Sequence, residues 1–151
     1  MKKRFLFLLL FLILAVFVVG CTSPAKTQFP QQVTIFKSQS CGCCGLYADY
    51  MQKRGFEVQV TNLPNMDSVK TQYAIPSNMQ SCHTTIVGDY FVEGHIPMEA
   101  IDKLLAEKPA VAGIAMPGMP YGSPGMPGNK QGPFVIYAIG KDGSIAEFMR
   151  M

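Results

Sequence analysis

The sequence contains no tryptophan, only two histidines and few charged residues, which make up 15% of the chain. Any imidazole ligand therefore has to come from His83 or His95. Common dithiol oxidoreductases carry a tryptophan before their first active-site thiol, and this chain has none to place there. We also find no internal repeat, which leaves solenoid and propeller architectures without support.

The first twenty residues are predicted to be an export signal. A positively charged start at 1–4 precedes an apolar run at 5–19, which is too short for a comfortable membrane span. The junction Val18-Val19-Gly20-Cys21 fits a bacterial lipobox, in which the signal is cut before the cysteine and the thiol receives a lipid. The alternative is an uncleaved single-span anchor with an incidental Cys21. Both interpretations place the rest of the chain outside the inner membrane, and the lipobox predicts a membrane-anchored periplasmic lipoprotein.

Three of the 13 Lys and Arg residues lie in that signal, and the ten that remain equal the ten Asp and Glu in number. The excess positive charge therefore belongs to targeting, and nucleic acid is not an expected partner. Residues 21–31 are interpreted as a tether. Residues 32–151 are enough for one domain with a core of its own.

The order of apolar patterns predicts an α/β domain of the thioredoxin-like type, β-α-β-α-β-β-α. The expected elements are a strand at 32–38, a helix from the cysteines to Gly55, a strand at 56–62, a short helix at 65–73, strands at 84–87 and 90–93, and a helix after Pro97. A loop rich in Met, Pro and Gly is expected at 115–128. Two further strands, at 134–139 and 144–148, predict a C-terminal β-hairpin.

Four cysteines of this domain are predicted to converge on one site. Cys41, Cys43 and Cys44 lie between the first strand and the first helix, and Cys82 precedes the third strand, where thioredoxins place the loop that faces the active site. Amides at a helix N-terminus lower the pKa of nearby thiols, and the thiolate is the form that binds metal or attacks disulfides. Cys41 and Cys44 form a C-x-x-C pair, which is typical of dithiol redox chemistry.

Cys43 favours metal binding over simple redox chemistry. A spare nucleophile beside a redox pair risks scrambling its disulfide, whereas additional thiolates bridge and neutralise Cu(I). Zinc is also satisfied by four thiolates, but its sites usually combine two separate C-x-x-C pairs, and here the split is three plus one. The alternative without metal or redox chemistry is a set of structural disulfides, which persist in an oxidising compartment. However, disulfide stabilisation grows with the length of the loop that is closed, and three thiols at one turn would close only short loops.

The two histidines and the loop methionines are candidate additional ligands. Met116, Met119 and Met126 offer thioether sulfur, which suits Cu(I) and needs no deprotonation, although each could be an ordinary apolar anchor. His83, which follows Cys82, and His95 are each either a ligand or a hydrogen-bonded structural residue.

Over residues 32–150 the chain resembles the CopG family of periplasmic copper-resistance proteins and their uncharacterised-domain relatives. The motifs that carry the resemblance are residues 37–45 (KSQSCGCCG), 81–84 (SCHT), 93–97 (EGHIP) and 118–126 (GMPYGSPGM). The resemblance implies a thioredoxin-like fold in which Cys41, Cys43, Cys44 and Cys82 bind a multinuclear Cu(I) cluster. It also implies a role in copper or silver tolerance, with copper oxidoreductase activity proposed.

The sequence therefore predicts an envelope protein that holds Cu(I) for copper resistance, with copper redox activity as an open part of the hypothesis. The expected partners are copper ions, the membrane through a lipid on Cys21, and other envelope copper-handling proteins. The alternative is a periplasmic thiol-disulfide oxidoreductase that uses Cys41 and Cys44. Against this alternative stand the missing tryptophan and the segment 81–84, which replaces the proline-containing loop of thioredoxins.

Overall fold

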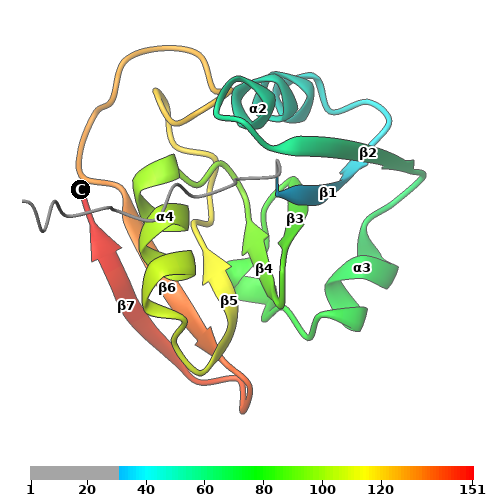
Figure 1. Cartoon of the computed structure of the whole chain (residues 1–151). Helices are drawn as coiled ribbons and strands as arrows, with labels where there is room; N and C mark the ends of the chain where they lie inside the picture. The colour runs from blue at the N-terminus through cyan, green and yellow to red at the C-terminus, as the bar shows by residue number, and fades with distance from the viewer. Residues whose placement is uncertain (1–30) are drawn as a thin grey trace, which may run out of the picture.

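The computed structural model describes residues 31–151, which form one mixed sheet of seven strands with three α-helices (Figure 1). The elements are β1 (Gln32–Ser38), α2 (Gly42–Lys53), β2 (Glu57–Leu63), α3 (Asp67–Gln72), the 3-10 helix η2 (Ser77–Met79), β3 (His83–Val87), β4 (Tyr90–Glu93), α4 (Met98–Glu107), β5 (Val111–Ala115), β6 (Val135–Gly140) and β7 (Ile145–Arg150). The predictions on the export signal, on the lipobox at Cys21 and on most of the tether lie outside the described residues.

The strands follow the order β2-β1-β3-β4-β5-β6-β7 across the sheet. The pairs β1/β2 and β4/β5 are parallel, and all the others are antiparallel. The α/β class and the order β-α-β-α-β-β-α up to α4 are confirmed, with every predicted boundary within two residues of the observed one. The assignment to the thioredoxin-like type stays a prediction.

The prediction omitted β5, and it was wrong about Ala115. Ala115 was expected to begin the loop, but it is the last residue of β5 and pairs with Glu93. The strand was missed because its residues are mostly small and do not alternate clearly between apolar and polar. Its Gly113 lies under the ring of Phe91 on β4. A Cβ added to Gly113 would lie 2.5 Å from Cγ of that ring, so the close packing of the two strands requires glycine.

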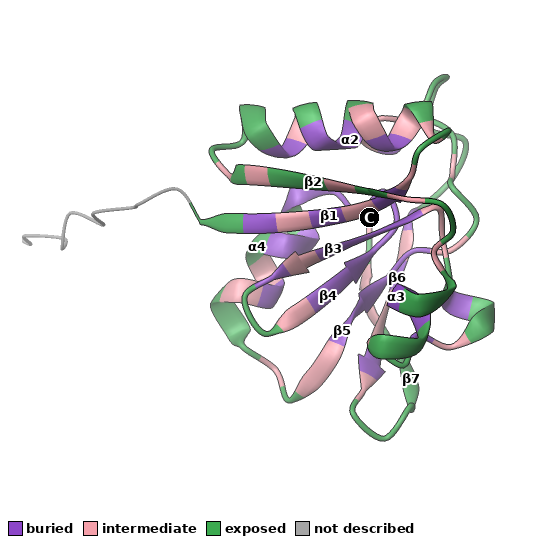
Figure 2. Cartoon of the chain, turned by 90° about the vertical axis from the view of Figure 1, so that its right-hand side faces the viewer, coloured by how far each residue is buried: buried purple, intermediate pink, exposed green. Residues whose placement is uncertain are grey.

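The sheet has an apolar core on each face. On one face, α2 and α4 pack side chains such as Tyr47, Met51 and Leu104 against alternate strand residues. On the other face, the segment from Tyr73 to Met79 packs on Phe91 and its neighbours. Figure 2 shows the buried side of α2 facing the sheet and α3 on the opposite side from α4. Both loops that carry cysteines adjoin this sheet: the first follows β1, and the second precedes β3.

The predicted Met/Pro/Gly-rich loop is confirmed for the residues after Ala115, which connect β5 to β6 without regular structure. Its Gly125, at φ +80°, lies against the start of α2: a Cβ there would come within 2.8 Å of the Tyr47 backbone nitrogen and 2.9 Å of the Cys43 carbonyl oxygen. The loop thus covers the first turn of α2, where the cysteines lie.

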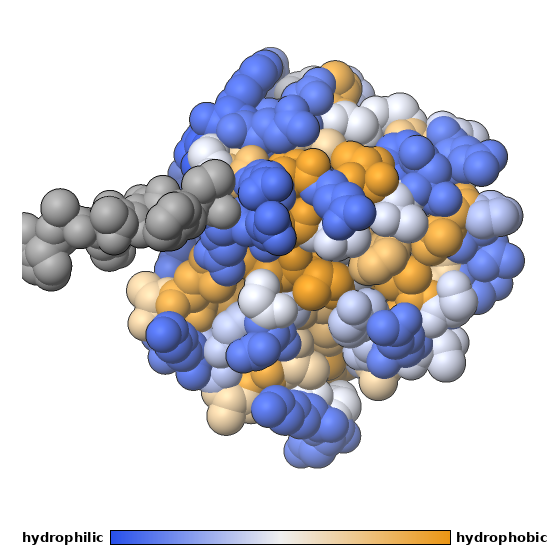
Figure 3. Space-filling view, turned by 45° about the vertical axis from the view of Figure 1, so that its right-hand side comes forward, coloured by the Kyte–Doolittle hydropathy of each residue, from blue (hydrophilic) through white to orange (hydrophobic). Residues whose placement is uncertain are grey.

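The surface of the described residues mixes hydrophilic side chains with apolar patches, as the face in Figure 3 shows. The exposed large apolar residues are Leu46, Val60, Met119, Tyr121 and Ile145. Between residues 31 and 151, no helix combines the length and the apolar character needed to span a membrane.

Candidate metal centre

The first cysteine segment is a turn between β1 and α2. The backbone N–H of Cys41 donates to the carbonyl of Ser38 at 3.1 Å, and Cys41 is the N-cap residue of α2. Cys43 and Cys44 therefore lie in the first helical turn, as the sequence predicted. No side chain caps this helix. Its free N–H groups and the positive end of its dipole face the region of the thiols and favour negative charge there.

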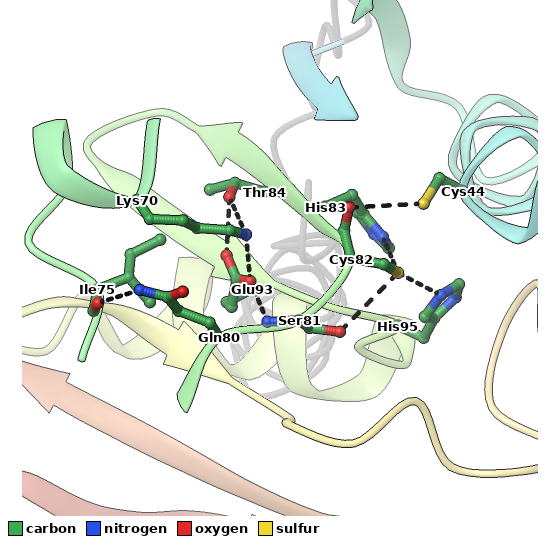
Figure 4. A network of polar contacts seen from close by, with 10 residues as sticks. All are labelled: Cys44, Lys70, Ile75, Gln80, Ser81, Cys82, His83, Thr84, Glu93 and His95. Atoms are coloured by element: carbon green, nitrogen blue, oxygen red, sulfur yellow. Dashed lines mark hydrogen bonds and ion pairs between the residues drawn. The ribbon is translucent and has the colours of Figure 1, made fainter. Parts of the chain in front are cut away.

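Cys82 lies on the neighbouring loop, which a buried network fixes from the other side (Figure 4). The Glu93 carboxylate accepts hydrogen bonds from the Ser81 backbone N–H at 2.5 Å and from the Thr84 hydroxyl at 2.8 Å. It also forms an ion pair with Lys70 of α3, and both side chains are buried. Burial raises the pKa of Glu93, while the Lys70 ammonium opposes this rise. The network thus holds the Ser81 backbone before Cys82 and the Thr84 side chain after it.

The two loops bring four sulfurs together. The Sγ atoms of Cys41, Cys43, Cys44 and Cys82, which we call the cysteine cluster, all lie within 4.8 Å of one another. Cys41 and Cys44 are joined by a disulfide, while Cys43 and Cys82 are free thiols. The Cys43 sulfur lies 3.5 Å from the Cys41 sulfur. The predicted convergence of Cys82 on the other three is therefore found in the structure.

Both histidines lie against Cys82. The Cys82 sulfur is 3.4 Å from Nδ1 of His83 and 3.2 Å from Nε2 of His95. These three ligand atoms, which we call the imidazole set, also lie within 4.8 Å of one another. Nδ1 of His95 donates to the carbonyl of Pro124 at 2.7 Å. The Pro124 contact leaves Nε2 of His95 as the nitrogen with a free lone pair, and it faces the sulfur.

The protonation of these groups follows from their burial. Burial and the neighbouring His95 lower the pKa of His83, and burial lowers the pKa of His95, so both imidazoles are neutral at pH 7. Burial and the nearby Cys43 raise the pKa of the Cys82 thiol to about 11. Neutral imidazole is the form that binds metal, whereas the Cys82 thiol must lose its proton when a metal binds.

The loop methionines occupy different environments. The side chain of Met116, directly after β5, is buried in the core under α2 and α4. Met119 is 41% exposed, with a left-handed φ of 46°. Their roles as additional ligands stay predictions.

Three residues that support the site were not predicted from the sequence. Glu93 and Lys70 support the Cys82 loop. Tyr47 packs on His83, with 4.5 Å between the two ring centroids. Glu93 had a sequence signal, because a carboxylate ends the apolar strand 90–93 directly before Gly94 and His95. For Tyr47 the sequence gives no signal except its place on the apolar face of the helix.

The donor atoms of the site fit a soft metal ion. Thiolate sulfur and imidazole nitrogen are the ligands that Cu(I) prefers, and in the cysteine cluster every donor is sulfur. Two of these four sulfurs are bonded to each other, so the cluster can offer four thiolates only after the Cys41–Cys44 disulfide is reduced.

Comparisons with known proteins agree with this chemistry. The model of a family described as "Protein of unknown function, DUF411" matches residues 79–126, and no curated protein matches the sequence. Two solved structures, described as form 1 and form 2 of "Copper resistance protein copG", are similar to this chain with a TM-score of 0.75 each. Each is 33% identical in sequence, and the match covers 81% of this chain and 98% of the solved chain.

Proposed function

Because the chain belongs to the family of the copper resistance protein CopG, we propose that it binds Cu(I) through the cysteine cluster and serves in copper or silver tolerance. The observation that carries the proposal is the convergence of four sulfurs from two separate loops within 4.8 Å. Copper is here the cargo or the substrate of the protein.

The charge of the cysteine cluster favours more than one copper ion. Four ionised thiolates carry four negative charges, and Cys44 is fully buried while the other three are only partly exposed. A single Cu(I) would leave most of this charge uncompensated, which is costly in a partly buried site. Several Cu(I) ions bridged by shared thiolates neutralise it. The additional ligands predicted in the sequence, His83 and His95, lie beside the Cys82 end of the cluster.

Cu(I) titration of the reduced protein tests the proposal. The protein is reduced, freed of reductant and loaded without oxygen, and we expect more than one copper per chain. Cys43→Ser and Cys82→Ser should each lower this ratio. Gly42→Ala is the matched control, because an added Cβ has open space around it and leaves every sulfur in place. A ratio that does not exceed one, or full loading of both serine variants, would contradict the proposal.

The Cys41–Cys44 disulfide supports a second candidate function, thiol-disulfide exchange. Opening the disulfide takes two electrons and two protons, which a reduced dithiol partner supplies while its own thiols become a disulfide. Insulin reduction separates the candidates. Activity that needs Cys41 and Cys44 but not Cys43 would favour the oxidoreductase, whereas copper loading that needs Cys43 favours copper binding.

We further propose that the protein is anchored in the cell envelope through a lipid on Cys21. The support is the apolar run at 5–19 followed by the lipobox sequence. Radioactive fatty acid should label the wild-type protein but not Cys21→Ser. Labelling that survives this substitution would exclude the lipid anchor.

A further inference from the structure

The cysteine cluster and the imidazole set share Cys82 and no other residue. The Cys82 sulfur lies beside both imidazoles, and the sulfur of Cys44, in the first turn of α2, lies 3.8 Å from the Cys82 carbonyl oxygen (Figure 4). Both sets therefore depend on the same thiolate.

The disulfide decides which set is complete. With Cys41 and Cys44 bonded to each other, only Cys43 and Cys82 of the cysteine cluster remain as thiols. The imidazole set contains neither disulfide residue, so all three of its donors remain. The form of the protein with the closed disulfide thus still offers one sulfur and two nitrogens.

The distances in the imidazole set suit one metal ion. Typical metal–sulfur and metal–nitrogen bonds of about 2.3 Å and about 2.0 Å, at a tetrahedral angle, place sulfur and nitrogen about 3.5 Å apart. The observed separations from the Cys82 sulfur are 3.4 Å to His83 and 3.2 Å to His95. Shifts of a few tenths of an ångström, within the reach of side-chain rotation, would complete the site.

The rings are held in place for this role. His95 donates its Nδ1 proton to Pro124, the kind of second contact that orients metal-binding histidines. His83 is fully buried, and its ring is fixed against Tyr47, whose hydroxyl donates to the carbonyl of Ile96. Within residues 31–151, Nε2 of His83 has no hydrogen-bond partner, so the ring makes its one polar contact with Cys82. That contact is made through Nδ1, so Nδ1 is the nitrogen that His83 offers to a metal beside the Cys82 sulfur.

We propose that the closed-disulfide form binds a single copper ion through Cys82, His83 and His95. Two histidines and one cysteine are a known ligand set for copper. The inference rests on the proposed function, because it takes the cysteine cluster to be the site that forms after reduction. The Cys41–Cys44 pair then sets the copper capacity of the protein: one ion when the disulfide is closed and more than one when it is open.

Cu(I) titration of the oxidised protein tests this assignment. The full chain is purified in detergent, the Cys41–Cys44 disulfide is verified by mass spectrometry, and Cu(I) is added without oxygen against a coloured Cu(I) chelator. We expect one equivalent to bind. Cys43→Ser should keep this equivalent, because Cys43 lies outside the imidazole set, whereas His95→Gln and His83→Gln should each lose it. X-ray absorption of the loaded wild-type protein should show one sulfur and two nitrogens.

The outcomes separate this inference from the proposed function. Failure of the reduced wild-type protein to bind more than one copper would overturn the proposed function. Loss of the single equivalent in Cys43→Ser, or its retention in both glutamine variants, would overturn the inference alone, because copper would then be held between Cys43 and Cys82. Should a glutamine variant not fold, as judged by circular dichroism, the absorption spectrum of the wild-type protein decides: two sulfurs contradict the inference, and one sulfur with two nitrogens supports it.

Discussion

The carboxylate of Glu93 accepts a hydrogen bond from the backbone N–H of Ser81 at 2.5 Å, directly before Cys82 in the chain. A buried acid on β4 therefore positions a sulfur on the preceding loop. The acid is itself paired with Lys70 of α3, so the helix on one face of the sheet supports the site on the other.

We expect Glu93→Gln to destabilise the protein strongly. The substitution leaves the buried Lys70 ammonium without a counter-charge, which costs about 3 kcal/mol or more in comparable buried pairs. Urea denaturation measures the loss in free energy of unfolding. The double variant Lys70→Met/Glu93→Gln removes both charges and should recover part of it.

The matched control for this experiment is Glu147→Gln, which breaks the exposed pair with Arg150 on β7. Exposed pairs contribute little because water and salt screen them, so this variant should unfold at the same urea concentration as the wild type. Equal stability of Glu93→Gln and Glu147→Gln would show that the buried network does not support the fold.

Cys82 should react slowly with iodoacetamide near neutral pH. The thiolate is the reactive form, and burial raises the pKa of this thiol to about 11, so its rate should keep rising as the pH increases from 8 towards 11. Peptide mapping of the metal-free protein follows the rate at Cys82 itself. Urea-unfolded protein is the reference, in which the rate should reach half its maximum near pH 9, the ordinary pKa of a thiol, and level off above it. Equal rates at pH 8 in folded and unfolded protein would contradict the buried position of the thiol.

In Cys43→Ser the same reaction should become faster at a given pH. The nearby Cys43 is the second cause of the raised pKa of Cys82, so its removal lowers that pKa, while burial remains. An unchanged rate profile at Cys82 would mean that the two thiols do not interact.

Gly125→Ala should disturb the covering loop. The added Cβ would lie within 3 Å of the backbone at Cys43 and Tyr47, and φ is +80°, so the loop must move away from α2. We expect faster alkylation of Cys43 and a lower melting temperature. Gly132→Ala, in the same loop but with open space around its Cβ, is the control and should behave as the wild type. Identical behaviour of the two variants would show that the loop does not cover the site.

The sequence was sufficient to predict most of the fold and the meeting of the four cysteines. Apolar alternation and glycine-containing turns are local signals, and the order of elements places residue 82 opposite the first helix once the strands pair. β5 was not predicted because the reason for a glycine at 113 is its close contact with Phe91, a partner twenty-two residues earlier in the chain.

The rest of the site depends on tertiary contacts that leave no local pattern. The closeness of His83 and His95 to the same sulfur follows from the register of β3 against β4. The pairing of Lys70 with Glu93 follows from the docking of α3, a helix of six residues, on the sheet. The disulfide joins Cys41 and Cys44, the C-x-x-C pair that the spacing indicated, but the sequence did not decide between this bond and four free thiolates.

In the reduced protein, we propose, Cu(I) is held between the thiolates of Cys41, Cys43, Cys44 and Cys82. X-ray absorption at the copper edge tests it most directly, because one spectrum reports oxidation state, ligand type and metal–metal distance. For the reduced protein loaded with more than one copper, we expect Cu(I), ligands that are mainly sulfur and a short copper–copper distance. Cu(II), ligands that are mainly nitrogen and oxygen, or copper ions with no metal neighbour would contradict it.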